Sequence, residues 1–138
     1  PPNAQFWFGT DSIGRDLYGR VERQDTPYTN RIKQGSVLRI PIGHGEGCYF
    51  APDAVLQELA KKRQVVFRYW DPKGEIPAEA NPNGSLQAIA GICNEKGNVL
   101  GMMPHPDRCA EEVLGNADGA RLFTSIIHAW QQARRNRI

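Results

Sequence analysis

The stretch "SLQAIAGICNEKGNVLGMMPHPDR", residues 85–108, decides the fold class of this 138-residue chain. It holds two apolar runs, 85–94 and 98–104, separated by the short polar tripeptide "EKG". The runs contain many residues that suit strands, and Gly97 tolerates the positive φ of a tight turn. The stretch therefore predicts a β-hairpin that leads into a loop.

That loop, "MMPHPDR", is the strongest candidate for chemistry in the sequence. Pro104 and Pro106 each fix their own φ and restrain the preceding residue, so they predict an extended His105 at a strand end. Asp107 can accept a hydrogen bond from the histidine Nδ1, which leaves Nε2 to exchange a proton with a thiol. On these residues alone, a simple turn in which Asp107 caps the next segment explains the pattern equally well.

Cys93 lies twelve residues before His105, but its surroundings favour a strand cysteine over a nucleophile. A nucleophile elbow in an α/β protein has the pattern G-x-C-x-G and leads into a helix. Here Gly91 is in place, but Glu95 replaces the second glycine, and a hairpin follows where the helix should begin. No helix N-terminus is then present to lower the thiol pKa.

Strands and loops account for much of the remaining chain. Three further segments contain β-formers and predict strands: 15–22, 36–43 and 64–70. The segment 71–85 is rich in proline and glycine and predicts a loop. In this loop, Asn81, Asn83 and Ser85 are expected to form a turn rather than to contact a ligand.

Two helices are expected. The first spans 52–63 and ends in cations, as the helix dipole favours. The second is capped by Asp118, with His128 in solvent. Its apolar residues recur at helical spacing: Leu122, Phe123, Ile126, Ile127 and Trp130. The result is one mixed α/β domain whose strands and helices alternate less evenly than in a self-contained doubly wound domain, so we expect a missing N-terminal unit.

Composition restricts the class of protein. The chain is 40% hydrophobic and 23% charged, with no apolar run of the roughly 18 residues that span a bilayer, so we expect a cytoplasmic protein without membrane contact. Three widely spaced cysteines predict reduced thiols rather than disulfides. The arginines of the tail "ARRNRI" suit a helix C-terminus better than a nucleic-acid site.

Five segments together resemble one family, the glutaminase subunits of phosphoribosylformylglycinamidine synthase, which are class I glutamine amidotransferases. The matching segments are "RVERQDTPYT" (20–29), "VLRIPIGHGEGCYF" (37–50), "VVFRYW" (65–70), "EANPNGSLQAIAGICNEKGNVLGMMPHPDR" (79–108) and "LGNADGARLFTSI" (114–126). The resemblance implies a flavodoxin-like α/β fold with a mixed sheet and flanking helices. It also implies that 1–138 is the C-terminal part of a single amidotransferase domain, without the part that carries the nucleophile elbow.

The resemblance implies a reaction and a set of site residues. In the family, an elbow cysteine attacks the glutamine amide and releases ammonia for de novo purine biosynthesis. His105 matches the catalytic histidine, and Asp107 matches the catalytic carboxylate, where the family has glutamate. In "GHGEG", His44, Gly45 and Glu46 are weaker candidates for contacts with substrate or with another subunit.

Partners are also implied by the resemblance. They are glutamine, the large synthetase subunit of this ATP-dependent ligase and a small bridging subunit. ATP and magnesium belong to the synthetase partner, and no cofactor or metal is expected here. Two alternatives remain: a remnant that docks the synthetase without catalysis, and a zinc site. The zinc site would use two H-x₃-C pairs: His44 with Cys48, and His105 with Cys109.

Self-association or a marginal fold is expected if part of the domain is missing. A doubly wound sheet is covered on both faces, so removal of covering units exposes apolar strands. The strands concerned are "VLRIPI" (37–42), "QVVFRYW" (64–70) and "SLQAIAGI" (85–92). Exposed strands of this kind pair between copies.

Overall fold

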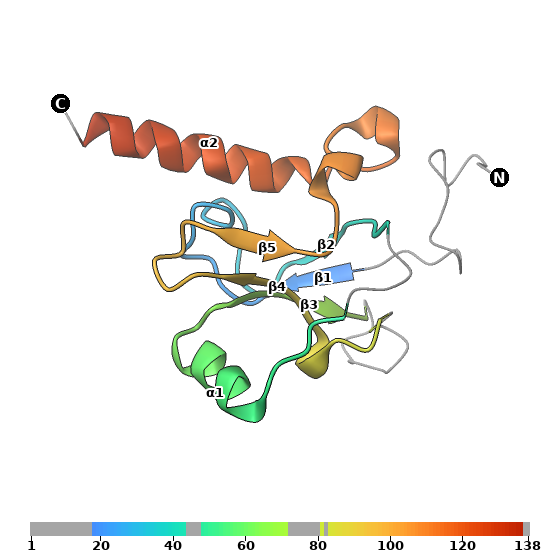
Figure 1. Cartoon of the computed structure of the whole chain (residues 1–138). Helices are drawn as coiled ribbons and strands as arrows, with labels where there is room; N and C mark the ends of the chain where they lie inside the picture. Colours follow the sequence, from blue (N-terminus) through green and yellow to red (C-terminus); the bar gives the residue numbers. More distant parts are fainter. Residues whose placement is uncertain (1–17, 44–47, 72–80, 82, 137–138) are drawn as a thin grey trace.

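The computed structural model describes residues 18–43, 48–71, 81 and 83–136, which form a five-stranded sheet with a helix on each side (Figure 1). The strands are β1 (Tyr18–Val21), β2 (Val37–Arg39), β3 (Val65–Trp70), β4 (Ile89–Cys93) and β5 (Leu100–Met102). The helices are α1 (Asp53–Lys61) and α2 (Ala120–Arg135). Short 3₁₀ turns lie at Leu86–Ala88, Pro106–Cys109 and Glu112–Leu114. The α/β class is confirmed.

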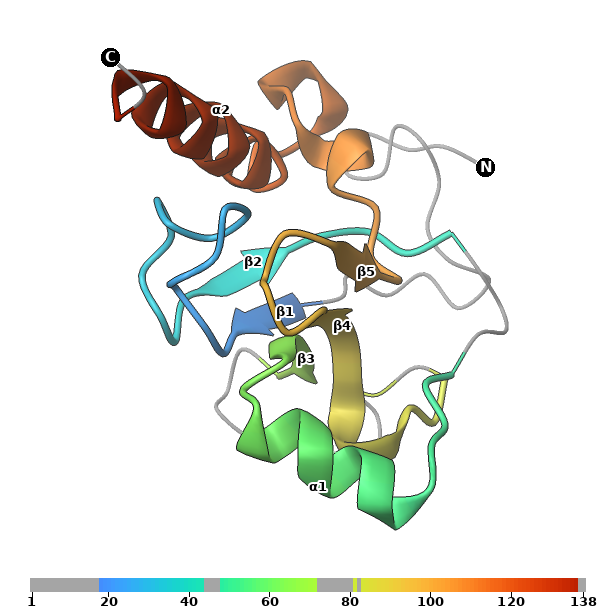
Figure 2. The same cartoon turned by 60° about the vertical axis from the view of Figure 1, so that its left-hand side comes forward.

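The strand order is β2-β1-β3-β4-β5, and every pair among these strands is antiparallel. The predicted hairpin is confirmed, because β4 pairs with β5 and Gly97 has a φ of 69° in the turn between them. Figure 2 shows that the sheet curls, so that β2 and β5 both lie toward α2. Just beyond these strands, the backbone N–H of His105 donates to the carbonyl of Pro41 at 2.8 Å.

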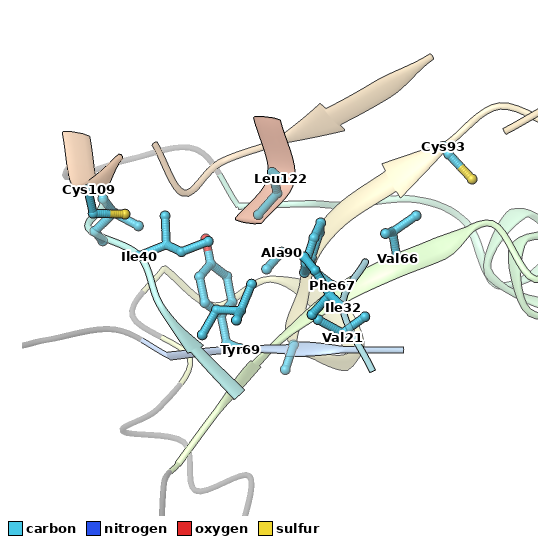
Figure 3. Close-up of a cluster of buried hydrophobic side chains, with 13 residues drawn as sticks. Val21, Ile32, Ile40, Val66, Phe67, Tyr69, Ala90, Cys93, Cys109 and Leu122 are labelled. Carbon is cyan, nitrogen blue, oxygen red and sulfur yellow. The ribbon is translucent and has the colours of Figure 1, made fainter. Parts of the chain in front are cut away.

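Two apolar clusters stabilise the sheet. The larger lies on the α2 side, and Figure 3 shows side chains from the strands, from α2 and from the turn at Cys109 gathered in it. Its fully buried side chains include Tyr69, Phe67, Ile32 and Leu38. The smaller lies under α1 and consists of Ala51, Leu56, Leu59, Val65 and Ile89. Burial of each large side chain is worth about 1.5 to 3 kcal/mol.

The expectation of uncovered strands is wrong. Apart from Val37, which is 37% exposed, the apolar side chains of the three segments at 37–42, 64–70 and 85–92 are buried or half-buried. The strands are covered because the sheet curls around its own core and α1 closes the other face. Among the described residues, exposed large apolar side chains cluster on α2 and also occur at single positions elsewhere, such as Phe50 and Val113.

Two details of α2 also differ from expectation. Asp118 does not cap the helix; its Oδ2 accepts the backbone N–H of Arg39 at 2.8 Å, and no side chain caps the helix N-terminus. His128 is not free in solvent, because its Nδ1 lies 2.9 Å from Oδ1 of Asn30 and the residue is half-buried. Both side chains bind groups far away in the sequence, which local patterns do not reveal.

Candidate functional site

The loop after β5 carries the candidate histidine in the predicted conformation. His105 has φ −103° and ψ 93°, in the extended region, and Pro106 opens the 3₁₀ turn that follows. The N–H of Arg108 donates to the carbonyl of His105 at 3.1 Å, which closes this turn. With the bond from His105 to Pro41, the backbone on both sides of the imidazole is fixed.

The N-terminus of α2 supports this loop from one side. The N–H of Gly119 donates to the carbonyl of Cys109 at 2.8 Å. A Cβ at Gly119 would collide with the carbonyl oxygen of Pro106, so only glycine permits this approach. The first turn of α2 therefore packs directly on the backbone of the histidine loop.

Arg108 supports the loop from the other side. Its guanidinium lies against the bare Cα of Gly43, where a Cβ would collide with Nη1. Gly43 is the first residue of "GHGEG", so the start of that segment lies beside the histidine loop. His44, Gly45 and Glu46 lie outside the described residues.

His105 and Asp107 lie near each other but do not form the expected hydrogen bond. Nδ1 of the histidine is 4.0 Å from Oδ1 of the aspartate, beyond hydrogen-bond distance. The imidazole is 39% exposed and the carboxylate 70% exposed. An accessible imidazole on a fixed backbone can act as a general base, and a modest rotamer change or one bridging water would join it to Asp107.

The described cysteines do not supply a nucleophile elbow. Cys93 is the last residue of β4 and is buried, which confirms the strand interpretation; its Sγ lies 3.6 Å from Nη1 of Arg23. Cys109 is also buried, and its Sγ donates to the carbonyl of Pro106 at 3.7 Å. Burial raises the pKa of the Cys109 thiol to about 11, so this thiol is unreactive near neutral pH. Cys48 is exposed.

The zinc alternative is not supported by this arrangement. Among the residues that the structure describes, no three histidine, cysteine or carboxylate side chains gather in a way that could hold a metal ion. Cys48, His105 and Cys109 are all described, so they do not form the proposed ligand set, and His44 lies outside the described residues. Two H-x₃-C pairs in the sequence do not imply that the pairs meet in space.

Asn81, Asn83 and Ser85 form internal hydrogen bonds, as expected of a turn. Ser85 Oγ accepts the backbone N–H of Tyr49 at 2.9 Å and donates to Oδ1 of Asn83 at 2.9 Å. Asn81 Nδ2 donates to the carbonyl of Ser85 at 2.7 Å. These bonds join the turn to the chain that leads into α1.

Sequence reasoning missed Gly119, Arg108 and Gly43 as supports of the histidine loop. Gly119 lies in "NADGARLF", where the neighbouring Asp118 was predicted to cap the helix. The dipeptide Asp118-Gly119 signals a turn, which accounts for the glycine without revealing the close backbone approach. Arg108 gave no such signal, because its partner is 65 residues away.

Comparison with known proteins gives consistent matches. A family model described as a CobB/CobQ-like glutamine amidotransferase domain matches residues 17–136. The phosphoribosylformylglycinamidine synthase subunit PurQ of Koribacter versatilis is 57% identical over 121 residues, which cover 88% of this chain and 52% of that protein. The PurQ subunit of Moorella thermoacetica is 54% identical over 116 residues, which cover 84% of this chain and 49% of that protein.

A solved structure of PurLQS from Thermotoga maritima matches with a TM-score of 0.67 and 40% identity. The match covers 84% of this chain and 47% of that one. This chain therefore spans about half the length of the curated relatives that it matches. Within the described residues, no helix combines the length and apolar character that crossing a membrane requires.

Proposed function

The chain belongs to the CobB/CobQ-like glutamine amidotransferase domain family, and we propose that it supplies the histidine part of the glutaminase site in phosphoribosylformylglycinamidine synthase. One observation carries the proposal. His105 is extended, accessible and fixed by backbone contacts at the end of β5, and we assign to it the role of the family's catalytic histidine. The relatives named PurQ support this assignment.

The proposed reaction needs a thiol that no described cysteine provides. We place this thiol in the part of the relatives that the chain does not span. His105 takes the thiol proton, the sulfur attacks the side-chain amide carbon of glutamine, and the C–N bond breaks as His105 returns the proton to the leaving amine. Water then hydrolyses the glutamyl thioester to glutamate, and the thiol is regenerated. Asp107 would orient the imidazole and stabilise its protonated form.

The released ammonia would pass to a synthetase partner. The PurLQS structure supports association with synthetase subunits, and the large subunit and a small bridging subunit are the partners we propose. ATP and magnesium would act in the synthetase, and this subunit would need no cofactor. Location in the cytoplasm belongs to the same proposal.

A chimaera tests the proposed activity. The part of the Moorella thermoacetica relative outside its matched residues is joined to this chain, and glutamate release from glutamine is measured. The chimaera should turn over glutamine, and the 138-residue chain alone should not. Glutamine hydrolysis by the chain alone, abolished by Cys93→Ala, would make Cys93 the nucleophile and overturn the assignment.

Substitutions in the chimaera test the two side chains. His105→Ala should lower turnover by about a thousandfold or more, because the base and the nucleophile act as one unit. Asp107→Asn should lower turnover by less than His105→Ala does. Asp107→Glu should preserve or raise turnover, since the family has glutamate there. The exposed Lys61→Ala on α1 serves as a control with unchanged turnover. Near-normal activity of the His105→Ala chimaera would refute the role of His105.

The alternative of a docking remnant makes a different prediction. A remnant would still bind the large synthetase subunit in a pull-down, yet its chimaera would release no glutamate even with the relative's cysteine in place. Binding together with turnover supports the glutaminase; binding without turnover supports the remnant.

A further inference from the structure

Helix α2 presents an apolar surface to solvent. Four large side chains make up this surface, which we call the α2 stripe: Phe123, Ile126, Ile127 and Trp130, at 38%, 38%, 55% and 58% exposure. Their spacing of three, four and seven residues places them on one face of the helix. This is the spacing with which helices insert anchor residues into a partner.

The α2 stripe is more exposed than the face by which the helix is attached to the core. A different face of α2 packs on the core, through Leu122 and Ser125, which are almost completely buried. Polar bonds fasten this face: Asn30 Nδ2 donates to the carbonyl of Ser125 at 2.8 Å, and the N–H of Arg31 donates to Ser125 Oγ at 3.1 Å. His128 adds its contact with Asn30. Because these contacts attach α2 while the α2 stripe remains 38% to 58% exposed, a patch of this kind marks an interaction site.

The order of residues along the α2 stripe is symmetric. A two-fold axis placed between Ile126 and Ile127, perpendicular to the plane of two antiparallel helices, brings each isoleucine beside its own equivalent. The same operation places Phe123 against Trp130 of the second copy. The α2 stripe is therefore complementary to itself, which is the requirement for an isologous dimer.

Charges at the two ends of α2 fit the same arrangement. The segment 107–118, just before the helix, carries four carboxylates against one guanidinium. The last turn of α2 carries Arg134 and Arg135, and the guanidinium carbon of Arg134 lies 4.8 Å from the ring centroid of Trp130, at the end of the α2 stripe. An antiparallel pair places each basic end beside an acidic segment and opposes the two helix dipoles. A parallel pair would gather like charges at both ends.

We propose that the α2 stripe binds the α2 stripe of a second copy of this chain in an antiparallel, two-fold symmetric pair. The relatives contain additional polypeptide that is a competing occupant. The apolar spacing of the α2 stripe is self-complementary, and the two ends of α2 carry opposite charges. Both features favour a second copy of the chain over the additional polypeptide as the occupant. The α2 stripe contains neither His105 nor Asp107, so substitutions in the stripe test dimerisation without altering the proposed catalytic residues.

Light scattering on the purified chain over a range of concentrations tests the proposal. The mass should rise to twice 15.4 kDa with concentration. Ile127→Glu should weaken the dimer at least about tenfold, as expected for a central apolar anchor. Val99→Glu places the same charge at another exposed apolar position, between β4 and β5, and should leave the dimer within about twofold of wild type. Circular dichroism confirms that both variants are folded.

Disulfide trapping tests the geometry in a Cys48→Ser background, which removes the exposed thiol. Ile127→Cys should form a linked dimer on mild oxidation, because the position lies beside its own equivalent. Phe123→Cys should not, since an antiparallel pair separates it from its equivalent by about 10 Å along the helix. Thr124→Cys, exposed on another face of α2, is the control that should also remain unlinked.

Each contrary outcome overturns the proposal. Efficient linkage through Phe123→Cys would indicate a parallel pair. Equal effects of Ile127→Glu and Val99→Glu would remove the α2 stripe from the interface. A chain that stays monomeric at every concentration, with Trp130 shielded from a quencher only when the rest of the Moorella relative is joined, would assign the α2 stripe to that segment.

Discussion

The two helices carry similar apolar stripes but are attached to the sheet in different ways. Helix α1 packs its apolar residues on the sheet, and Leu56 and Leu59 are each 7% exposed. Helix α2 buries Leu122 and Ser125 and leaves its larger apolar side chains in solvent. An apolar stripe therefore identifies an amphipathic helix without showing whether the stripe covers the helix's own sheet.

The difference extends to the candidate site. The buried residues of the cluster under α1 are Ala51, Leu56, Leu59, Val65 and Ile89, none of which belongs to the histidine loop. On the α2 side, Gly119 contacts the backbone of Pro106 and Cys109, so the position of the helix and the position of the loop depend on each other. Substitutions under α1 should change stability alone, whereas substitutions at the start of α2 should also change the surroundings of His105.

Gly119→Ala should produce the largest loss of stability. The new methyl group would collide with the carbonyl oxygen of Pro106, so α2 or the loop must move, at a cost of about 4 kcal/mol in the free energy of unfolding. Urea denaturation measures this change. In the same variant, the NMR resonances of the His105 imidazole should shift, because the loop that carries His105 packs on the start of α2.

Gly101→Ala is the matched control, because a Cβ at this exposed position in β5 meets nothing within 4 Å. It should change the free energy of unfolding by no more than about 0.5 kcal/mol. Equal effects of the two substitutions would show that Gly119 does not support the histidine loop.

Leu59→Ala tests the apolar attachment of α1. Removal of this side chain should lower the free energy of unfolding by about 3 kcal/mol, since it opens a cavity against Val65 and Ile89. On α2, Ile127→Ala should cost less than about 0.5 kcal/mol at concentrations where the chain is monomeric, because this side chain is 55% exposed. Val55→Ala, at a 43% exposed position of α1, should behave like Ile127→Ala. A large loss from Ile127→Ala in the monomer would mean that the α2 stripe packs within the chain.

Local patterns predicted the elements that form from neighbouring residues. The hairpin followed from two apolar runs around Gly97, and the strand at 65–70 followed from its β-formers. The extended His105 followed from the prolines on either side of it. In these cases the residues that impose the structure are adjacent in sequence, so periodicity and turn chemistry were sufficient.

The remaining features depend on partners that lie far away. Asp118 resembles a helix cap, but Arg39 at the edge of the sheet offers its backbone N–H to the carboxylate, and the tertiary bond replaces the local one. The expected bond between His105 and Asp107 does not form because Pro106 places the aspartate in a 3₁₀ turn that leaves its carboxylate largely in solvent. The strands are covered because the sheet curls, and this curl depends on contacts along the whole sheet rather than on neighbouring residues.

High pH should weaken the cluster on the α2 side and spare the one under α1. Desolvation raises the pKa of Tyr69 to about 12, above the ordinary value of 10.0 that it regains on unfolding. A raised pKa gives stability that is complete below pH 10 and is lost as the pH rises toward 12, by about 2 to 3 kcal/mol. Denaturation at several alkaline pH values should show this loss, and Tyr69→Phe should reduce it. An unchanged pH dependence in Tyr69→Phe would assign the loss to other groups.

Ser125→Ala should produce the smallest loss among the substitutions of buried residues and tests whether polar bonds hold α2. Ser125 Oγ accepts the N–H of Arg31 and donates to the carbonyl of Arg121 at 2.9 Å, so alanine leaves a backbone donor unpaired at a site with no water access. The expected cost is about 1.5 kcal/mol, because the bond from Asn30 to the backbone carbonyl remains. Thr124→Ala, exposed on the same helix, should change stability by less than about 0.5 kcal/mol. If Ser125→Ala were as stable as wild type, apolar contacts through Leu122 would be sufficient to hold α2, and the two helices would be attached in the same way after all.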